Sequence, residues 1–173
     1  GSTVDEYAYC YRTIAEASTV YTRGYFKFSV LPAANKYQEY IGFGGAGGGV
    51  AGFGLINDAG TYKWLTNYWT GVAWTDFRSA GVVPTINTWY SMEGYCLVNN
   101  GTGAVTFYID GVNKTGGNPI DTDGHGNIIQ VNVGLATNPD NVALTVTGDC
   151  IIIGSSLIGV EVGPSIGQFA VSD

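Results

Sequence analysis

The stretch Thr88–Gly117, TWYSMEGYCLVNNGTGAVTFYIDGVNKTGG, decides the fold. Residues 89–98 alternate between two sets of side chains, which predicts a strand with one apolar face. The apolar face consists of Tyr90, Met92, Gly94, Cys96 and Val98. Residues 99–103 include asparagine and glycine, which tolerate the positive φ of a hairpin loop. The return strand 105–109 ends in Asp110-Gly111, a second hairpin signal, so the stretch predicts a β-meander.

A tryptophan that opens a strand, a turn, and an aromatic strand ending in Asp-Gly together resemble the LamG-like, or concanavalin A-like lectin/glucanase, jelly roll. The matching pieces are Trp89–Cys96 and Thr106–Gly111, and a looser resemblance runs from about residue 5 to residue 159. The resemblance implies an all-β, two-sheet antiparallel β-sandwich. Such domains occur as lectins, carbohydrate-binding modules, glycosidases, lyases and adhesion modules, so the fold alone does not choose a function.

The composition agrees with strands rather than helices. Hydrophobic residues make up 45% of the 173 residues and charged residues 12%. Tyrosine, threonine, valine and isoleucine are plentiful, which favours strands. We expect residues 3–173 to form a single domain, with Gly1-Ser2 as a cloning scar.

The charge excludes some classes of partner. The formal net charge is −7 and the sequence pI is near 4.4, which argues against nucleic acid and anionic membranes. No apolar run is long enough to span a bilayer. The sequons Asn100-Gly101-Thr102 and Asn113-Lys114-Thr115 fit a protein that is secreted or on the cell surface.

The densest aromatic stretch, residues 61–79, is the candidate binding site. It reads TYKWLTNYWTGVAWTDFRS and mixes aromatic rings with polar side chains. Rings that stack on sugar faces, beside groups that bind hydroxyls, suit carbohydrate recognition, whereas the simpler interpretation is that the rings fill the core. The candidate ligand-binding residues are Trp64, Tyr68, Trp69, Trp74, Asp76 and Arg78.

Residues 42–47, GFGGAG, match G-x-G-x-x-G literally. No helical pattern follows and no βαβ unit surrounds them, so a nucleotide site is not supported. Glycines within strands more often mark bends or places where another group comes close to the backbone.

Residues 121–127, DTDGHGN, resemble the first half of an EF-hand calcium loop. His125 stands at position 5 and Asn132 replaces the glutamate of position 12, which weakens the match. Asp121, Asp123 and Asn127 are the candidate ligands of a structural Ca²⁺ ion, and the alternative is a polar turn.

Three cysteines, Cys10, Cys96 and Cys150, lack metal-ligand spacing. Cys96 lies on an apolar strand face and is interpreted as a buried thiol. In the resembled jelly roll the terminal strands are expected to be neighbours, which allows either a bridge between Cys10 and Cys150 or two unpaired core thiols.

No catalytic motif is recognised. His125 is the only histidine, and G-x-S-x-G is absent. The Glu-x-Asp-x-Glu strand of the resembled glucanases is absent, as are the Arg-rich strand and Gln-x-His motif of the resembled alginate lyases. Glu39, Glu93 and Glu161 each stand alone, although carboxylates distant in sequence can still converge. We therefore expect that the chain is not an enzyme.

These observations predict a non-catalytic carbohydrate-binding module that holds a neutral polysaccharide by aromatic stacking and hydrogen bonds to hydroxyls. Attached to other domains, it would raise the effective concentration of a catalytic neighbour at the polysaccharide. The first alternative is a structural or adhesion domain of the cell surface. The second is a glycosidase or polysaccharide lyase of the same fold.

Overall fold

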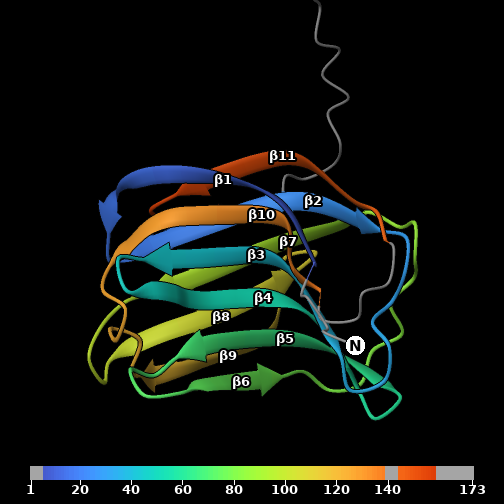
Figure 1. Ribbon diagram of the computed structural model, residues 1–173, viewed down its shortest axis with the longest axis horizontal. Helices are drawn as coiled ribbons and strands as arrows, with labels where there is room; N and C mark the ends of the chain where they lie inside the picture. The colour runs from blue at the N-terminus through green and yellow to red at the C-terminus, as the bar shows by residue number, and fades with distance from the viewer. Residues whose placement is uncertain (1–5, 139–143, 159–173) are drawn as a thin grey trace, which may run out of the picture.

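Two antiparallel sheets packed face to face form the molecule (Figure 1). The structure is a computed structural model that describes residues 6–138 and 144–158. Within these ranges every regular element is a β-strand, and no helix could cross a membrane. The prediction of an all-β, two-sheet antiparallel sandwich is confirmed.

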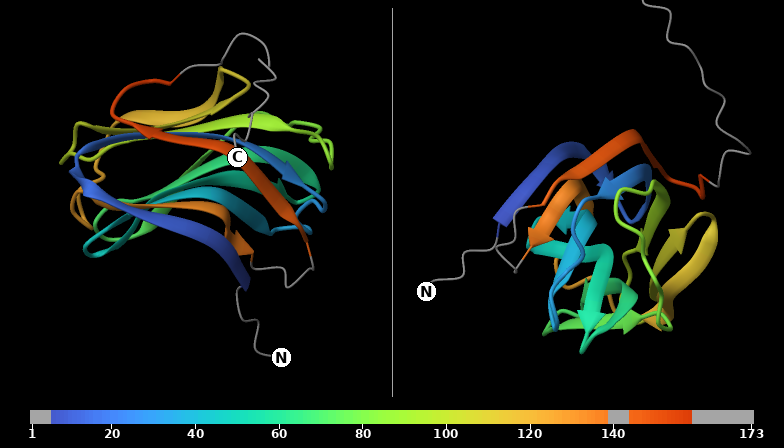
Figure 2. Two further views of the ribbon diagram at one scale, coloured as in Figure 1. Left: turned by 90° about the horizontal axis from the view of Figure 1, so that it is seen from above. Right: turned by 90° about the vertical axis from the view of Figure 1, so that its right-hand side faces the viewer.

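The front sheet faces the viewer in Figure 1 and has six strands in the order β1-β10-β3-β4-β5-β6. Their bounds are β1 Glu6–Ala17, β10 Ile128–Asn138, β3 Tyr37–Gly45, β4 Gly48–Asp58, β5 Thr61–Trp69 and β6 Trp74–Arg78. The back sheet has the order β11-β2-β7-β8-β9. Its bounds are β11 Val146–Gly154, β2 Thr19–Phe28, β7 Tyr90–Leu97, β8 Gly103–Ile109 and β9 Val112–Ile120. Figure 2 shows the two layers from above.

The predicted meander is the centre of the back sheet. β7, β8 and β9 follow one another in sequence and pair as antiparallel neighbours. Asp110 and Gly111 both have positive φ at the second turn, as the sequence signal predicts. Met92 and Cys96 on β7 are fully buried, so the predicted apolar face does point into the core.

Aromatic rings join the two sheets. The Phe53 ring on β4 lies 5.6 Å from the Phe107 ring on β8, measured between centroids. Gly94 on β7 makes room for this contact, because an added Cβ would come within 2.7 Å of Phe53. Each ring buried in this way stabilises the fold by about 1.5–3 kcal/mol relative to exposure.

The terminal strands lie in different sheets, and this corrects the expectations for two cysteines. β1 pairs with β10 in the front sheet and β11 pairs with β2 in the back sheet, so the two are not hydrogen-bonded neighbours. None of the three cysteines forms a disulfide bond within the described residues. Cys10 and Cys150 are exposed rather than bridged or buried in the core, whereas Cys96 is buried as predicted. Residues 163–173, which combine turn residues with a short apolar patch, lie outside the described residues.

Candidate functional site

A row of paired residues crosses β3, β4, β5 and β6 on the outer face of the front sheet. Gly42 pairs with Gly52, Gly52 with Asn67, and Asn67 with Asp76. Side chains alternate between the two faces of a strand, and the neighbouring Phe53 is buried in the core. The row therefore faces away from the back sheet.

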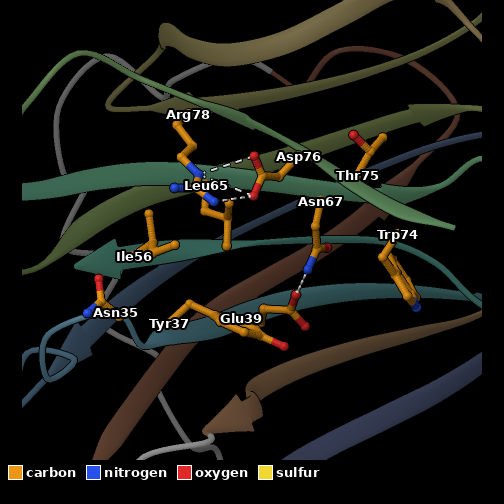
Figure 3. A pocket seen from close by; sticks show the side chains of 10 residues that line it. All are labelled: Asn35, Tyr37, Glu39, Ile56, Leu65, Asn67, Trp74, Thr75, Asp76 and Arg78. Carbon is orange, nitrogen blue, oxygen red and sulfur yellow. Dashed lines mark hydrogen bonds and ion pairs between the residues drawn. The ribbon is translucent and has the colours of Figure 1, made fainter. Parts of the chain in front are cut away.

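The two glycines of this row leave space above the sheet. The Asn67 side-chain amide of β5 reaches over Gly52 of β4 and donates to Oε1 of Glu39 on β3 (Figure 3). A Cβ at position 52 would lie 2.5 Å from both Asn67 Oδ1 and Glu39 Oε1. Only glycine at position 52 allows the two side chains to meet in this way. Asn67 Oδ1 is shielded from solvent and has no hydrogen-bond partner in the described part of the chain.

These side chains belong to an open pocket of about 560 Å³, which we call the trough (Figure 3). Its residues come from β3–β6 and from the loop before β3. They are Asn35, Tyr37, Glu39, Ile56, Leu65, Asn67, Trp74, Thr75, Asp76 and Arg78. Polar groups that can donate or accept hydrogen bonds thus alternate with apolar side chains and an indole ring.

The cation of the trough, Arg78, is paired with two aspartates. Arg78 donates from Nε to Asp76 Oδ1 at 3.1 Å and from Nη2 to Oδ2 at 2.8 Å. Its Nη1 lies 3.3 Å from Asp58 Oδ1, and Lys63 Nζ donates to Asp58 Oδ2 at 2.7 Å. Hydrogen bonding to Asp76 raises the pKa of Arg78, and hydrogen bonding to Lys63 lowers the pKa of Asp58. Among the described residues that line the trough, Arg78 is the one cation, and Glu39 and Asp76 are the two carboxylates.

Trp74 stands at one end of the trough with 51% of its surface exposed. Its ring packs edge-on against Trp69 at 5.8 Å, and Trp69 stacks on His125 at 4.7 Å with an interplanar angle of 8°. His125 is anchored because its Nδ1 donates to the carbonyl oxygen of Gly49 at 2.7 Å. The exposed indole therefore packs against Trp69, which in turn is stacked on the anchored His125.

The structure corrects two of the six predicted ligand-binding residues. Trp64 is 3% exposed and Tyr68 is 8% exposed, so both rings are core and cannot meet a ligand from solvent. The reason is the alternation of β5, which sends these two side chains inward and Asn67 and Trp69 outward. Trp69 is half-buried, whereas Trp74, Asp76 and Arg78 lie together at the trough.

Sequence reasoning missed Glu39, Asn67 and the outward glycines. Asn67 could have been found, because strict alternation through β5 places it opposite the buried Trp64 and Tyr68. Glu39 lies 28 residues earlier, and no local pattern links it to Asn67. Gly42, the first glycine of the G-x-G-x-x-G match, belongs to the outer face of β3 and not to a turn before a helix.

The candidate calcium ligands do not form a carboxylate cluster. The backbone N–H of Asp123 donates to Asp121 Oδ1 at 3.3 Å, and Asn127 Nδ2 donates to Glu16 Oε1 at 2.9 Å. Within residues 6–138 and 144–158, no three histidine, cysteine, aspartate or glutamate side chains gather as metal ligands would. The calcium ion stays a prediction.

Two carboxylates converge on the trough from distant parts of the sequence. Glu39 accepts the hydrogen bond of Asn67, and Asp76 is the cross-strand partner of Asn67 on the other side. Asp76 on β6 accepts hydrogen bonds from Arg78, and Glu39 is contributed by β3. The isolated glutamate of the sequence therefore lines the same pocket as Asp76.

Comparison with known proteins places the fold but not a family. No protein-family model matches the sequence, and no curated protein sequence matches it. Among solved structures it is similar to an endo-β-1,4-glucuronan lyase from the fungus Trichoderma reesei, with a TM-score of 0.66 and 14% identity over 90% of this chain and 77% of the lyase. The alginate lyase from Klebsiella pneumoniae gives a TM-score of 0.55 and 7% identity over 80% of this chain and 60% of that one.

A binding domain shares the fold as well. The binding domain of botulinum neurotoxin serotype C1 gives a TM-score of 0.55 and 11% identity over 86% of this chain. The chain spans 35% of that neurotoxin chain, about a third of its length. The fold is therefore one that polysaccharide lyases and binding domains share, as the jelly-roll resemblance implies.

These neighbours contradict the expectation that the chain is not an enzyme. Polysaccharide lyases stand among its most similar structures, so this fold carries catalysis on polysaccharides. The expectation rested on contiguous motifs, and residues that meet across strands escape such a search.

Proposed function

We propose that the chain binds a neutral polysaccharide in the trough on the outer face of the front sheet. The observation that carries this proposal is the Asn67–Glu39 pair over Gly52, beside the exposed ring of Trp74. An amide and a carboxylate present donors and acceptors to hydroxyl groups, and an indole face stacks on the C–H face of a sugar ring. The similarity to polysaccharide lyases and a binding domain supports it.

The pairing of charges favours an uncharged polymer. Arg78 is occupied by Asp76 and Asp58, and Lys63 is occupied by Asp58. A polyuronate would bring further carboxylates next to Glu39 and Asp76 without an uncommitted cation among the trough residues to receive them. We expect a glucan-like or mannan-like chain for this reason.

The second candidate function is cleavage of the chain held in the trough. Glu39 and Asp76 lie on opposite sides of Asn67, and a pair of carboxylates is the usual requirement for acid–base cleavage of a glycosidic bond. Lyases among the structural neighbours show that this fold accommodates polysaccharide cleavage. Elimination requires a uronate, so a neutral chain in the trough would be cleaved by hydrolysis.

We further propose that the protein works outside the cell or on its surface, attached to other domains. The sequon Asn100-Gly101-Thr102 stands at the exposed β7–β8 turn, where a glycan could be added in a secreted protein.

One set of variants tests the proposed function. Wild-type protein, Trp74→Ala and Asn67→Ala are titrated with a panel of soluble polysaccharides, and Trp89→Ala serves as the matched control because Trp89 is 44% exposed but does not line the trough. Trp74→Ala should weaken binding by about 1–3 kcal/mol, by analogy with base stacking on aromatic rings. Equal binding by all four proteins, or none by the wild type, would favour the adhesion alternative.

Cleavage is measured in the same samples. New reducing ends report cleavage by hydrolysis or by elimination. Ultraviolet absorbance of unsaturated uronate ends reports elimination, for the members of the panel that contain uronates. Product that disappears in Glu39→Gln and persists in Trp89→Ala would establish an active site in the trough. Binding without any product would leave recognition as the function.

A further inference from the structure

The row of paired residues that crosses the trough continues beyond it to the other edge of the front sheet. Gly42 on β3 pairs with Asn132 on β10, and Asn132 pairs with Tyr11 on β1. One line of partners thus runs from Tyr11 through Asn132, Gly42, Gly52 and Asn67 to Asp76. It crosses all six strands and has glycines at its centre.

The amides of β10 form a second polar patch on this line. Gln130 Nε2 donates to Asn132 Oδ1 at 2.6 Å. Gln130 pairs with Gly44 on β3, just as Asn132 pairs with Gly42, so neither amide faces a neighbouring side chain on that strand. A Cβ at Gly42 would make ordinary van der Waals contacts with Asn132 at 3.6 Å and Ala136 at 3.8 Å, so a methyl group would fit there without displacing either residue.

Aromatic rings lie at the edge strand beside this patch. Tyr11 is 65% exposed and Tyr9 is 41% exposed. Tyr11 is the cross-strand partner of Asn132 and Tyr9 that of Gly134, so strand alternation places both tyrosines on the outer face of the front sheet. Tyr11 also borders an open pocket at the edge of the sandwich, which Cys10, Val133 and Ile151 line. An exposed ring therefore stands at each end of the front sheet, Tyr11 at β1 and Trp74 at β6.

The dimensions suit an extended ligand. Neighbouring strands lie about 4.7–4.9 Å apart, so five spacings from β1 to β6 measure about 24 Å. A compact ligand would occupy the trough and leave the β10 amides unused. A linear polymer that lies across the strands would cover the trough, the glycine centre and the β10 amides in turn.

We propose that Tyr11, Asn132 and Gln130 form a second sugar subsite, so that the face binds an internal segment of a long neutral polysaccharide lying across the strands. This inference rests on the proposed function of the trough and extends it to the β1–β10 side. Tyr11 provides the stacking ring, and the two amides bind hydroxyls. Chain ends and short oligosaccharides would occupy the trough alone.

The test is the dependence of affinity on chain length. β-1,4-Linked gluco- and manno-oligosaccharides, from disaccharide to octasaccharide, are titrated into the wild type, Tyr11→Ala, Tyr11→Phe, Asn132→Ala and the trough variant Trp74→Ala, with Trp89→Ala as the control. Wild-type affinity should rise with length. Tyr11→Ala should weaken octasaccharide binding about tenfold and leave disaccharide binding unchanged, whereas Tyr11→Phe keeps the stacking ring and should bind as the wild type does.

The outcomes separate this inference from the proposed function. If Trp74→Ala weakens every oligosaccharide and the Tyr11 and Asn132 variants weaken none, the second subsite is wrong and the trough stands. If the wild type binds a disaccharide as tightly as an octasaccharide, the extended mode is wrong. If neither oligosaccharide series binds to the wild type, the second subsite and the trough proposal both fail for these polymers. Melting temperatures of all variants must stay near that of the wild type, and Asn132→Ala provides the independent readout if Tyr11→Ala does not fold.

Discussion

The side-chain amide of Asn67 on β5 donates to Glu39 on β3, and the two residues meet over the bare backbone of Gly52 on β4. Strands that are not neighbours in the sheet therefore contribute to one polar group. The contact depends on a glycine in the intervening strand, a position where the entropic cost of glycine would otherwise weaken the strand. The site is thus built by the register of three strands rather than by a local motif.

Two tryptophans ten residues apart in sequence should behave in opposite ways. Trp64→Ala removes a buried ring that packs against Tyr90 and Phe107, and should reduce the free energy of unfolding by about 3–5 kcal/mol. Trp74→Ala removes an exposed ring and should change stability far less. Urea denaturation of both variants measures the difference. Equal destabilisation would show that Trp74 also belongs to the core.

The sequence predicted both of these tryptophans as binding residues, and the structure exposes Trp74 but buries Trp64. Local alternation predicted β7 and β8 correctly because each strand shows one apolar face. Residues 61–79 mix aromatic and polar side chains on both faces, and this composition suggested an exposed binding surface. Strict alternation along β5 would instead have predicted that Trp64 is buried. The contact between Glu39 and Asn67 could not be predicted, because it depends on how β3, β4 and β5 pair. No local spacing in a single sequence encodes that pairing.

The three thiols should differ in reactivity. Burial raises the pKa of Cys96 to about 12, so almost no thiolate forms at neutral pH, whereas Cys10 and Cys150 are exposed. Titration of the native protein with a thiol reagent should modify Cys10 and Cys150 quickly and Cys96 only after unfolding. A denatured, unreduced sample with a single reactive thiol would instead indicate a bridge between Cys10 and Cys150.

The stability of the fold should fall in acid partly through Asp58. Hydrogen bonding to Lys63 lowers the pKa of Asp58 below its ordinary value. The folded chain therefore favours the charged carboxylate more strongly than the unfolded chain does. The resulting contribution of Asp58 to the free energy of unfolding is fully present above the unfolded pKa and is lost as pH falls through the folded pKa. Melting temperatures of the wild type and Asp58→Asn should converge below about pH 4. A constant gap between them at every pH would show that the ion pairs add nothing.

The calcium prediction for Asp121, Asp123 and Asn127 has a direct check. An ion bound to the folded state would stabilise it by mass action, so excess chelator should lower the melting temperature and added calcium should restore it. Asp121→Asn should abolish this response. A melting temperature indifferent to both chelator and calcium would identify residues 121–127 as a polar turn.

The most direct test of the trough is the polysaccharide affinity of Gly52→Ala, compared with Gly42→Ala. A methyl group at Gly52 would lie 2.5 Å from Asn67 Oδ1 and Glu39 Oε1 and must displace both side chains, whereas a methyl group at Gly42 meets its neighbours at an ordinary 3.6 Å. Because the displaced atoms end flexible side chains, both variants should fold with similar melting temperatures. The account predicts that Gly52→Ala loses at least tenfold in affinity and that Gly42→Ala loses much less, a difference of about 1.4 kcal/mol or more. Wild-type affinity in Gly52→Ala would contradict it.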